Sequence, residues 1–92
     1  MAQVRIKYLN VYSAITGKRE EIVETRGSIV LLELLNEVFG RYGSKLKDVV
    51  MTKEDQLNPH IWMLVNRERV TDLTKEIRSG DVVVFSFPVC GG

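Results

Sequence analysis

The sequence predicts a single α+β domain in which a mixed β-sheet packs against one main helix. Short segments of alternating polar and apolar residues lie near both ends of the chain, and one longer amphipathic segment lies between them. The chain has 92 residues, which is enough for one small hydrophobic core. Because a helix separates the first and last strands along the chain, these two strands can pair in parallel at the centre of the sheet.

The first predicted strand covers residues 4–8, where apolar residues alternate with Arg and Lys. A period of two is typical of a half-buried strand. The apolar character continues through Leu9, Val11 and Tyr12 toward Gly17, a turn candidate because glycine reaches positive φ without steric cost. We expect residues 20–25 to return as the second strand of an N-terminal hairpin.

A stripe of apolar residues predicts the main helix over residues 29–42. Its members follow one another at spacings of four, three and four, so they share one helical face. The stripe consists of Leu31, Leu35, Val38 and Tyr42. Ser28 is the predicted N-cap, and Gly43 is the predicted residue after the helix, since glycine accepts the left-handed conformation found there.

The second half of the chain predicts a short apolar turn and three further strands. Leu46, Val49 and Val50 suggest the turn, and the polar segment 52–60, which contains His60, is expected to be a loop. The strands are expected at Ile61–Val65, at Glu68–Val70 after a tight turn that begins at Asn66, and at Val82–Phe87. The predicted order is strand, strand, helix, strand, short strand, strand.

The composition excludes several classes of protein. With 13 Lys and Arg against 12 Asp and Glu, the net charge is +1, so no broad basic surface indicates a binder of nucleic acid or membrane. A single Cys rules out an internal disulfide, and one His with one Cys rules out a zinc finger. We expect no metal site, no bound cofactor, and no nucleic-acid or membrane partner.

Two further absences in the sequence bear on location and catalysis. The N-terminus has no apolar run typical of a signal peptide, and the longest apolar runs are too short to span a bilayer. A cytoplasmic protein is therefore expected. With one His and no Gly-rich phosphate loop before a helix, the chain offers no nucleophilic or phosphate-binding motif. We expect it not to be an enzyme by itself.

The C-terminal sequence Phe-Pro-Val-Cys-Gly-Gly carries the most information about function. Two glycines without Cβ atoms make a narrow tail, which could enter a tight channel and offer its terminal carboxylate to another protein's active site. Pro88 has no N–H and therefore ends the pairing of the last strand. The alternative is an ordinary frayed chain end.

This tail, together with three other segments, resembles the MoaD/ThiS family of ubiquitin-like sulfur carriers. Within the family it is most similar to the MoaD branch, the small subunits of molybdopterin synthase, which end Pro-Pro-Val-x-Gly-Gly. The matching segments occur in the family's order over nearly the whole chain: Val4–Tyr8, Val65-Asn66, Gly80–Val83 and Pro88–Gly92. Two departures are Phe87, in place of the first proline, and Arg67, where the family often has the glycine that a tight turn favours.

The resemblance implies a β-grasp fold, with a mixed sheet of four to five strands on one main helix. Residues 1–88 would form this domain, and residues 89–92 would form a flexible tail. An E1-like, MoeB-like enzyme would use ATP to adenylate the carboxylate of Gly92, and sulfur transfer would convert it to a thiocarboxylate. A MoaE-like large subunit would then take in Pro88, Val89, Cys90 and Gly91 and use the sulfur to make molybdopterin.

Two alternatives remain open at this point. In the first, a lysine of a target protein attacks the activated Gly92 and the chain becomes a ubiquitin-like protein modifier. In the second, the chain is a non-covalent ubiquitin-like binding module whose Gly-Gly end is incidental. Cys90 is either a small tail residue or a thiol that captures the activated carboxyl group or forms a disulfide with an enzyme.

Alternation along the strands also predicts a partner-binding patch on the sheet. If Val65 faces the helix, then Trp62, Leu64, Val82 and Val84 face the other way. Exposed apolar surface of this kind marks a partner site, unless the loop 52–60 or the chain's own edge covers it. The predicted patch comprises Trp62, Leu64, Val82, Val84 and Phe87. The lysines and arginines are scattered along the sequence, as expected for a solvated surface.

Overall fold

A computed structural model describes residues 1–87 of the chain, and the predicted tail residues Pro88, Val89, Cys90, Gly91 and Gly92 lie outside this range. The elements within the described range follow in the order β1 (Ala2–Tyr8), α1 (Val11–Thr16), β2 (Glu20–Thr25), β3 (Ile29–Val30), α2 (Leu31–Tyr42), α3 (Ser44–Val50), β4 (Trp62–Val65), β5 (Glu68–Arg69), β6 (Glu76–Ile77) and β7 (Val82–Ser86).

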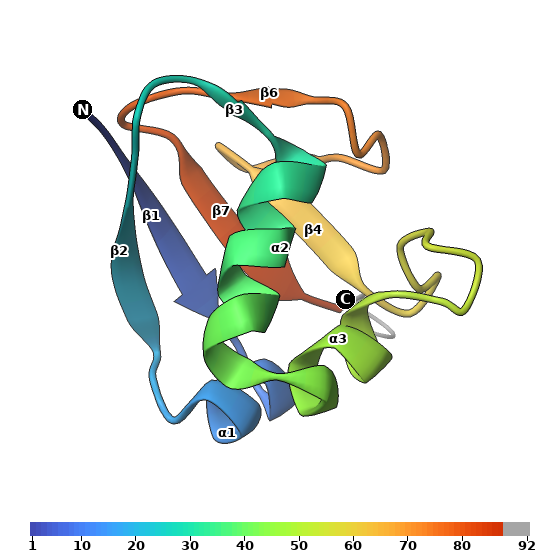
Figure 1. Cartoon of the computed structure of the whole chain (residues 1–92). Coiled ribbons are helices and arrows are strands. Elements are labelled where there is room, and N and C mark those ends of the chain that lie inside the picture. The colour runs from blue at the N-terminus through green and yellow to red at the C-terminus, as the bar shows by residue number, and fades with distance from the viewer. Residues whose placement is uncertain (88–92) are drawn as a thin grey trace.

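Five of the strands form one mixed sheet, and α2 crosses one face of it (Figure 1). The strand order is β2-β1-β7-β4-β5. The central pair, β1 and β7, is parallel, with Arg5 to Tyr8 opposite Val82 to Phe85. The other neighbours are antiparallel. The predicted α+β class and the central pairing of the first and last strands are both confirmed.

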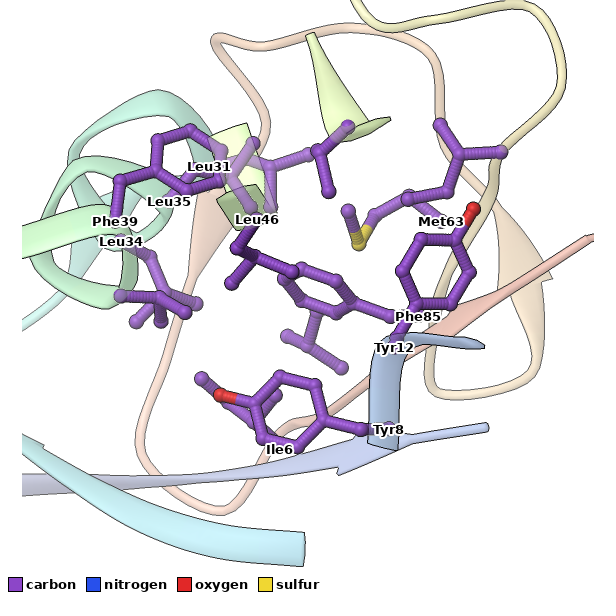
Figure 2. Packing of buried hydrophobic residues seen from close by; sticks show 14 of the residues in the cluster. Ile6, Tyr8, Tyr12, Leu31, Leu34, Leu35, Phe39, Leu46, Met63 and Phe85 are labelled. Atoms are coloured by element: carbon purple, nitrogen blue, oxygen red, sulfur yellow. The ribbon is translucent and has the colours of Figure 1, made fainter. Parts of the chain in front are cut away.

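The core lies between the sheet and α2 because both elements turn apolar residues to the same layer. Alternate residues of β1 and β7 are buried, among them Ile6 and Phe85. From α2, Leu31, Leu34 and Leu35 approach the same layer, and Figure 2 shows these side chains facing those of the sheet. Since each buried aliphatic or aromatic side chain contributes about 1.5–3 kcal/mol, this layer is the main source of stability.

The sequence placed no helix after β1, but Val11–Thr16 forms the helix α1. The backbone turns at Asn10, whose φ is 54°. Tyr12 and Thr16, four residues apart, then point inward together. Gly17 ends the helix at a φ of 75°, and its N–H donates to the carbonyl of Ser13 at 2.8 Å.

The main helix begins at Leu31, so the prediction of Ser28 as its N-cap is wrong. The two residues before the helix, Ile29 and Val30, instead form β3, which pairs with β6 in a small second sheet. The carboxylate of Glu33 accepts a hydrogen bond from the Val30 N–H at 3.4 Å. At the other end, Gly43 follows the helix, as predicted, and donates to the carbonyl of Phe39 at 2.7 Å. Its φ of 79° and ψ of −164° differ from the predicted left-handed helical conformation and lie in a region that is open almost only to glycine.

The turn between β4 and β5 places two non-glycine residues at positive φ. Asn66 has a φ of 50° and Arg67 a φ of 73°. Two consecutive positive values are typical of the tight hairpin turn that normally takes Asn-Gly. Asparagine tolerates this conformation, whereas arginine is strained there by its Cβ.

A buried carboxylate ties β2 to β1 and to the end of α2. The side chain of Glu21 is only 7% exposed, and one of its oxygens accepts hydrogen bonds from the hydroxyls of Tyr8 and Tyr42, each at 2.5 Å. The other oxygen lies 3.1 Å from Arg41 and 3.6 Å from Lys18. The network therefore joins three elements around one negative charge.

These contacts shift the pKa values of the network in opposite directions. Burial alone raises the pKa of Glu21, but the hydrogen bonds from the two tyrosines and the nearby cations bring it below its ordinary value. Burial and the hydrogen bond to Glu21 raise the pKa of Tyr42 to about 12, and the same causes raise the pKa of Tyr8. The ionised carboxylate is thus the form that the fold stabilises.

We expect Arg67→Gly to increase the free energy of unfolding by about 1 kcal/mol, because glycine occupies positive φ without strain. Urea denaturation measures this change. Arg67→Ala is the matched control, since it removes the same side chain but keeps a Cβ, and it should give no gain. Equal stability of the two variants would contradict the strain at this turn.

We expect Glu21→Gln to lower the free energy of unfolding by about 2 kcal/mol at pH 7, because charge-assisted hydrogen bonds are lost. The folded pKa of Glu21 is lowered, so the contribution of its charge is complete above the unfolded pKa of about 4.3 and disappears as the pH falls through the folded pKa. Urea denaturation from pH 7 to pH 3 should therefore show the difference between variant and wild type shrinking.

Glu20→Gln is the matched control for this measurement. Glu20 lies next in sequence, but its side chain is 52% exposed and 3.9 Å from that of Arg5. Exposed ion pairs of this kind contribute little, so a change below about 0.5 kcal/mol is expected. If Glu20→Gln lowered the free energy of unfolding as much as Glu21→Gln, the stabilising role of ionised Glu21 would be contradicted. An effect of Glu21→Gln that does not depend on pH would contradict it as well.

Candidate protein-interaction site

The face of the sheet opposite α2 carries the predicted patch, and the strand register arranges its residues in rows. Trp62, Leu64, Val82 and Val84 are half-buried, while their neighbours along the strands, such as Met63 and Val83, are buried beneath α2. One row crosses four strands and consists of Lys7, Val84, Leu64 and Arg69. The predicted orientation of β4 and β7 is confirmed.

Trp62 occupies the end of this face at which β7 ends. It is paired with Ser86, whose hydroxyl donates to the Trp62 carbonyl at 3.0 Å. The guanidinium carbon of Arg69 lies 4.5 Å from the centre of the indole ring, a geometry in which the cation is attracted to the ring face. The indole is therefore held in place and presents its apolar surface next to a positive charge.

Phe87 lies on the side of the sheet opposite to Trp62, Leu64, Val82 and Val84. It follows Val83 and Phe85 at intervals of two and packs partly against the core. Its ring centre is 5.6 Å from that of Tyr12, which is buried on α1 and also contacts Phe85. The prediction that Phe87 belongs to the outer patch is therefore wrong. The contact of Phe87 with α1 fixes the chain just before Pro88.

The structure adds residues to this face that the sequence did not single out. Leu9 follows β1 on the outward side and is 44% exposed, and Ile22 on β2 is 50% exposed. Three cations also reach this face from separate segments: Lys7, Arg67 and Arg69. The sequence did not indicate this group, because its members lie on β1, in the turn after β4 and on β5. They come to share one face only through the register of the sheet.

The loop 52–60 lies at the end of α3, as Figure 1 shows. Its main-chain bonds return to that helix: Asn58 donates to the carbonyl of Val50 at 2.8 Å, and Met51 forms a bridge with Leu57. Leu57 packs against the core side. His60 lies at its end and is exposed. The contacts of this loop therefore lie on the helical side of the molecule.

Hydrogen bonds join Asn66 to the Gly80-Asp81 segment and to the first residue of β7. The Asn66 amide donates to a carboxylate oxygen of Asp81 at 2.9 Å and accepts from the Val82 N–H at 3.0 Å. The other oxygen of Asp81 accepts from the Arg78 N–H at 2.8 Å. Although burial alone raises it, the pKa of Asp81 is lowered by these bonds and by nearby cations. This clamp fixes the start of β7 against the hairpin of β4 and β5.

The described residues contain neither a candidate metal site nor a membrane-spanning helix. Within residues 1–87, no group of three or more His, Cys, Asp or Glu side chains could hold a metal ion. No helix in the same range has the length and apolar character needed to cross a membrane. What this part of the chain offers is an apolar surface with cations around it, next to the segment that leads to Gly92.

A family model places the chain among known proteins, because the model of the ThiS family matches residues 6–92. The chain belongs to the ThiS family. The match includes the C-terminal Pro-Val-Cys-Gly-Gly sequence as well as the domain. A search of curated proteins found no match.

Solved structures similar to this ThiS-family chain share its whole fold. The small archaeal modifier protein 1 of Haloferax volcanii is 24% identical, with a TM-score of 0.83 over 97% of this chain and 100% of that one. A putative molybdopterin converting factor subunit 1 from Pyrococcus furiosus is 25% identical, with a TM-score of 0.79 over 97% and 100%. In the BexX/CysO complex of Amycolatopsis orientalis, one chain is 29% identical, with a TM-score of 0.72 over 97% and 99%.

These matches confirm the β-grasp, ubiquitin-like fold and the resemblance to the MoaD/ThiS family. They identify the chain as a ThiS- or MoaD-like protein in the class of small sulfur carriers and modifiers, whose members are generally non-catalytic. Proteins of this class are known in complexes, as with BexX/CysO. The molybdopterin-converting factor subunits 1 and 2 of Helicobacter pylori also form a complex.

We expect Asn66→Gly to lower the free energy of unfolding by about 1–2 kcal/mol, although glycine is favoured at the φ of this residue. The loss would come from the side-chain bonds to Asp81 and Val82. Asn10→Gly is the matched control, because Asn10 has a similar φ of 54° and its side chain caps nothing in α1. Urea denaturation should show little change or a gain for Asn10→Gly. A gain in both variants would contradict the clamp.

Proposed function

We propose that this ThiS-family chain is a sulfur carrier whose Gly92 becomes a thiocarboxylate and donates sulfur in molybdopterin biosynthesis. The observation that carries the proposal is the family match over residues 6–92 together with the Gly-Gly end of the sequence. The similarity to a putative molybdopterin converting factor subunit 1 supports the choice of molybdopterin. A MoeB-like activating enzyme and a MoaE-like synthase subunit are the proposed partners.

The proposed chemistry starts from a carboxylate, which is a poor electrophile. An oxygen of the Gly92 carboxylate attacks the α-phosphorus of ATP on the activating enzyme, and pyrophosphate leaves. A sulfur donor at the oxidation level of hydrogen sulfide then attacks the carbonyl carbon, AMP leaves, and the terminus becomes a thiocarboxylate. This sulfur is a nucleophile at neutral pH, which suits it for delivery to a second enzyme.

In this proposal the domain presents the tail, and the enzymes supply the catalysis. The contact between Phe87 and Tyr12 fixes the chain directly before the tail sequence Pro88, Val89, Cys90, Gly91 and Gly92. The outer face of the sheet, with Trp62 and Leu64, would dock against the enzymes that act on Gly92. Half-buried apolar side chains beside cations are typical of the centre and rim of a protein interface.

The alternative function is that of a protein modifier joined through Gly92 to lysines of other proteins. The similarity to the small archaeal modifier protein 1 of Haloferax volcanii supports it through the fold. The adenylated carboxyl group is common to both routes, and only the nucleophile differs: sulfur in one and a lysine amine in the other. A non-covalent binding module is the third candidate, and it would need no activated terminus.

Mass analysis of the C-terminus distinguishes these functions. The chain would be expressed in its native host with an N-terminal tag, purified under denaturing conditions and treated with a thiocarboxylate-reactive label. We expect a labelled terminal thiocarboxylate on the free chain. Because methionine oxidation adds nearly the same mass as exchange of oxygen for sulfur, the label must accompany the mass, and the Cys90→Ala form controls for reaction at the thiol.

Each alternative predicts a different spectrum. Gly92 remnants on lysines of other proteins would indicate the modifier, and remnants together with thiocarboxylate would indicate both roles. An unmodified terminus without adducts, in cells with active sulfur metabolism, would contradict the carrier and favour the binding module. If the Cys90 thiol captures the activated carboxyl group, Cys90→Ala should also lower the yield of thiocarboxylate. An unchanged yield of thiocarboxylate would contradict this role of Cys90.

A further inference from the structure

The strand β2 forms one edge of the five-stranded sheet, so one side of its main chain has no neighbouring strand among the described residues (Figure 1). Antiparallel strands exchange main-chain hydrogen bonds at every second residue pair. The Tyr8 N–H donates to the carbonyl of Arg19 at 2.8 Å, which fixes the pairs that bond β2 to β1. The remaining residues, whose main-chain groups point away from the sheet, are therefore Glu20, Ile22 and Glu24.

The hydrogen bonds on the other side of β1 agree with this assignment. The residues of β1 that stand opposite Ile22 and Glu24 are Arg5 and Gln3. Their main-chain groups are used toward the segment before β7, where the Arg5 N–H donates at 3.1 Å and the Gln3 carbonyl accepts at 2.9 Å. These groups do not bond to β2, so the outer side of β2 is a row of donors and acceptors without a partner strand in residues 1–87.

Carboxylates flank the one exposed apolar side chain of this edge. Ile22 is 50% exposed, and Glu20 and Glu24 lie two residues away from it in either direction, on the same face of the sheet. The rise of an antiparallel strand puts the two carboxylates about 14 Å apart. Glu20 is 3.9 Å from Arg5, but both side chains are about half exposed, so this pair is weak.

The negative charge continues from this edge onto α2. A hollow of about 440 Å³ is lined by the end of β2, by the segment after it and by α2. Glu24, Glu33 and Glu37 line it together with one cation, Arg26. None of the ion pairs within residues 1–87 involves these three carboxylates. The hollow is therefore negative, and it lies directly beside the unpaired edge.

These features select among possible occupants of the edge. A second copy of the chain that paired antiparallel around Ile22 would place Glu20 opposite Glu24 twice, and like charges directly opposite each other destabilise a sheet. A nucleic acid or an anionic membrane would be repelled by the same carboxylates. An extended protein segment with Lys or Arg beside an apolar residue satisfies both the main-chain groups and the charges.

We infer that β2 binds an extended basic segment of a partner protein as an additional, antiparallel strand. An apolar side chain of the segment would lie beside Ile22, and Lys or Arg two residues before and after it would meet Glu20 and Glu24. Basic side chains on the other face of the segment would reach Glu33 and Glu37. In binding of this kind the main-chain bonds give affinity and the side chains give specificity. The inference goes beyond the proposed function and does not depend on Gly92.

The experiment titrates the isotope-labelled full-length chain with the blocked peptide Gly-Arg-Lys-Val-Lys-Arg-Gly and follows the amide signals by NMR. We expect saturation at peptide concentrations below about 1 mM at low salt. Amide hydrogen exchange at Ile22 and Glu24 should become at least tenfold slower in the complex, because these N–H groups gain acceptors. Exchange at Glu21 and Val23, whose N–H groups face β1, should change little.

The test variant combines Glu24→Gln, Glu33→Gln and Glu37→Gln. We expect its Kd for the peptide to rise about tenfold at low salt, because three attracting charges are lost. The control variant has the same net charge and neutralises three exposed carboxylates away from this edge, and its Kd should stay within twofold of wild type. The residues changed to their amides in the control are Asp48, Glu54 and Glu68. Thermal unfolding shows that both variants fold.

Two modified peptides test the main-chain bonds separately from the charges. N-methylation of the valine removes an N–H that would donate to β2 and should raise the Kd about tenfold. N-methylation of one lysine, whose N–H would point away from β2, should have a smaller effect. Equal Kd values for the two protein variants or for the two methylated peptides would overturn the inference. No binding to the wild type at 1 mM peptide would do so as well, and would indicate that the carboxylates only protect the edge from other strands.

The chain lacking Gly92 separates this inference from the proposed function. It should bind the peptide with the Kd of the full-length chain, because the edge of β2 lies on the far side of β1 from β7. A loss of binding in this chain would overturn the assignment of the peptide to β2. Failure of the carrier function would instead appear as a terminus without thiocarboxylate in a chain that still binds the peptide.

Discussion

The parallel pairing of β1 with β7 at the centre of the sheet is the constraint on which the rest of the structure depends. It joins the first and last segments of the domain, with Ile6 opposite Val83 and Tyr8 opposite Phe85. Every one of these four side chains is buried against the helical layer. The same register turns Lys7 and Val84 to the opposite face. One set of main-chain bonds therefore determines the core, the outer surface and the point at which the chain leaves the sheet.

Several local contacts hold this central pair of strands in place. The clamp between Asn66 and Asp81 fixes the start of β7, and the contact between Tyr12 and Phe87 fixes its end. The ionised Glu21 holds β2 and α2 beside β1. Under the proposed function such a frame matters, because enzymes that act on the terminal carboxylate would meet the outer face of the sheet in a constant relation to Phe87, after which the tail begins.

The sequence predicted the features that a local pattern determines. Alternation in residues 4–8 predicted β1, and the apolar stripe of residues 31–42 predicted α2. It did not predict α1, a helix of six residues with only two buried positions, or the pairing of β3 with β6, whose two-residue strands lie far apart in sequence. In the candidate site, the orientation of Trp62 and Val84 followed from alternation, whereas the grouping of Lys7 with Arg69 depends on register across four strands.

The most direct measurement of the central proposal is the molybdopterin content of native cells whose chromosomal copy encodes the chain without Gly92. Removal of this residue leaves the sequence of residues 1–87 unchanged. Molybdopterin, measured as its fluorescent oxidation product, should fall to background and return when the full-length chain is supplied. Molybdopterin at the wild-type level in the cells without Gly92 would contradict the proposal that this terminus carries the sulfur.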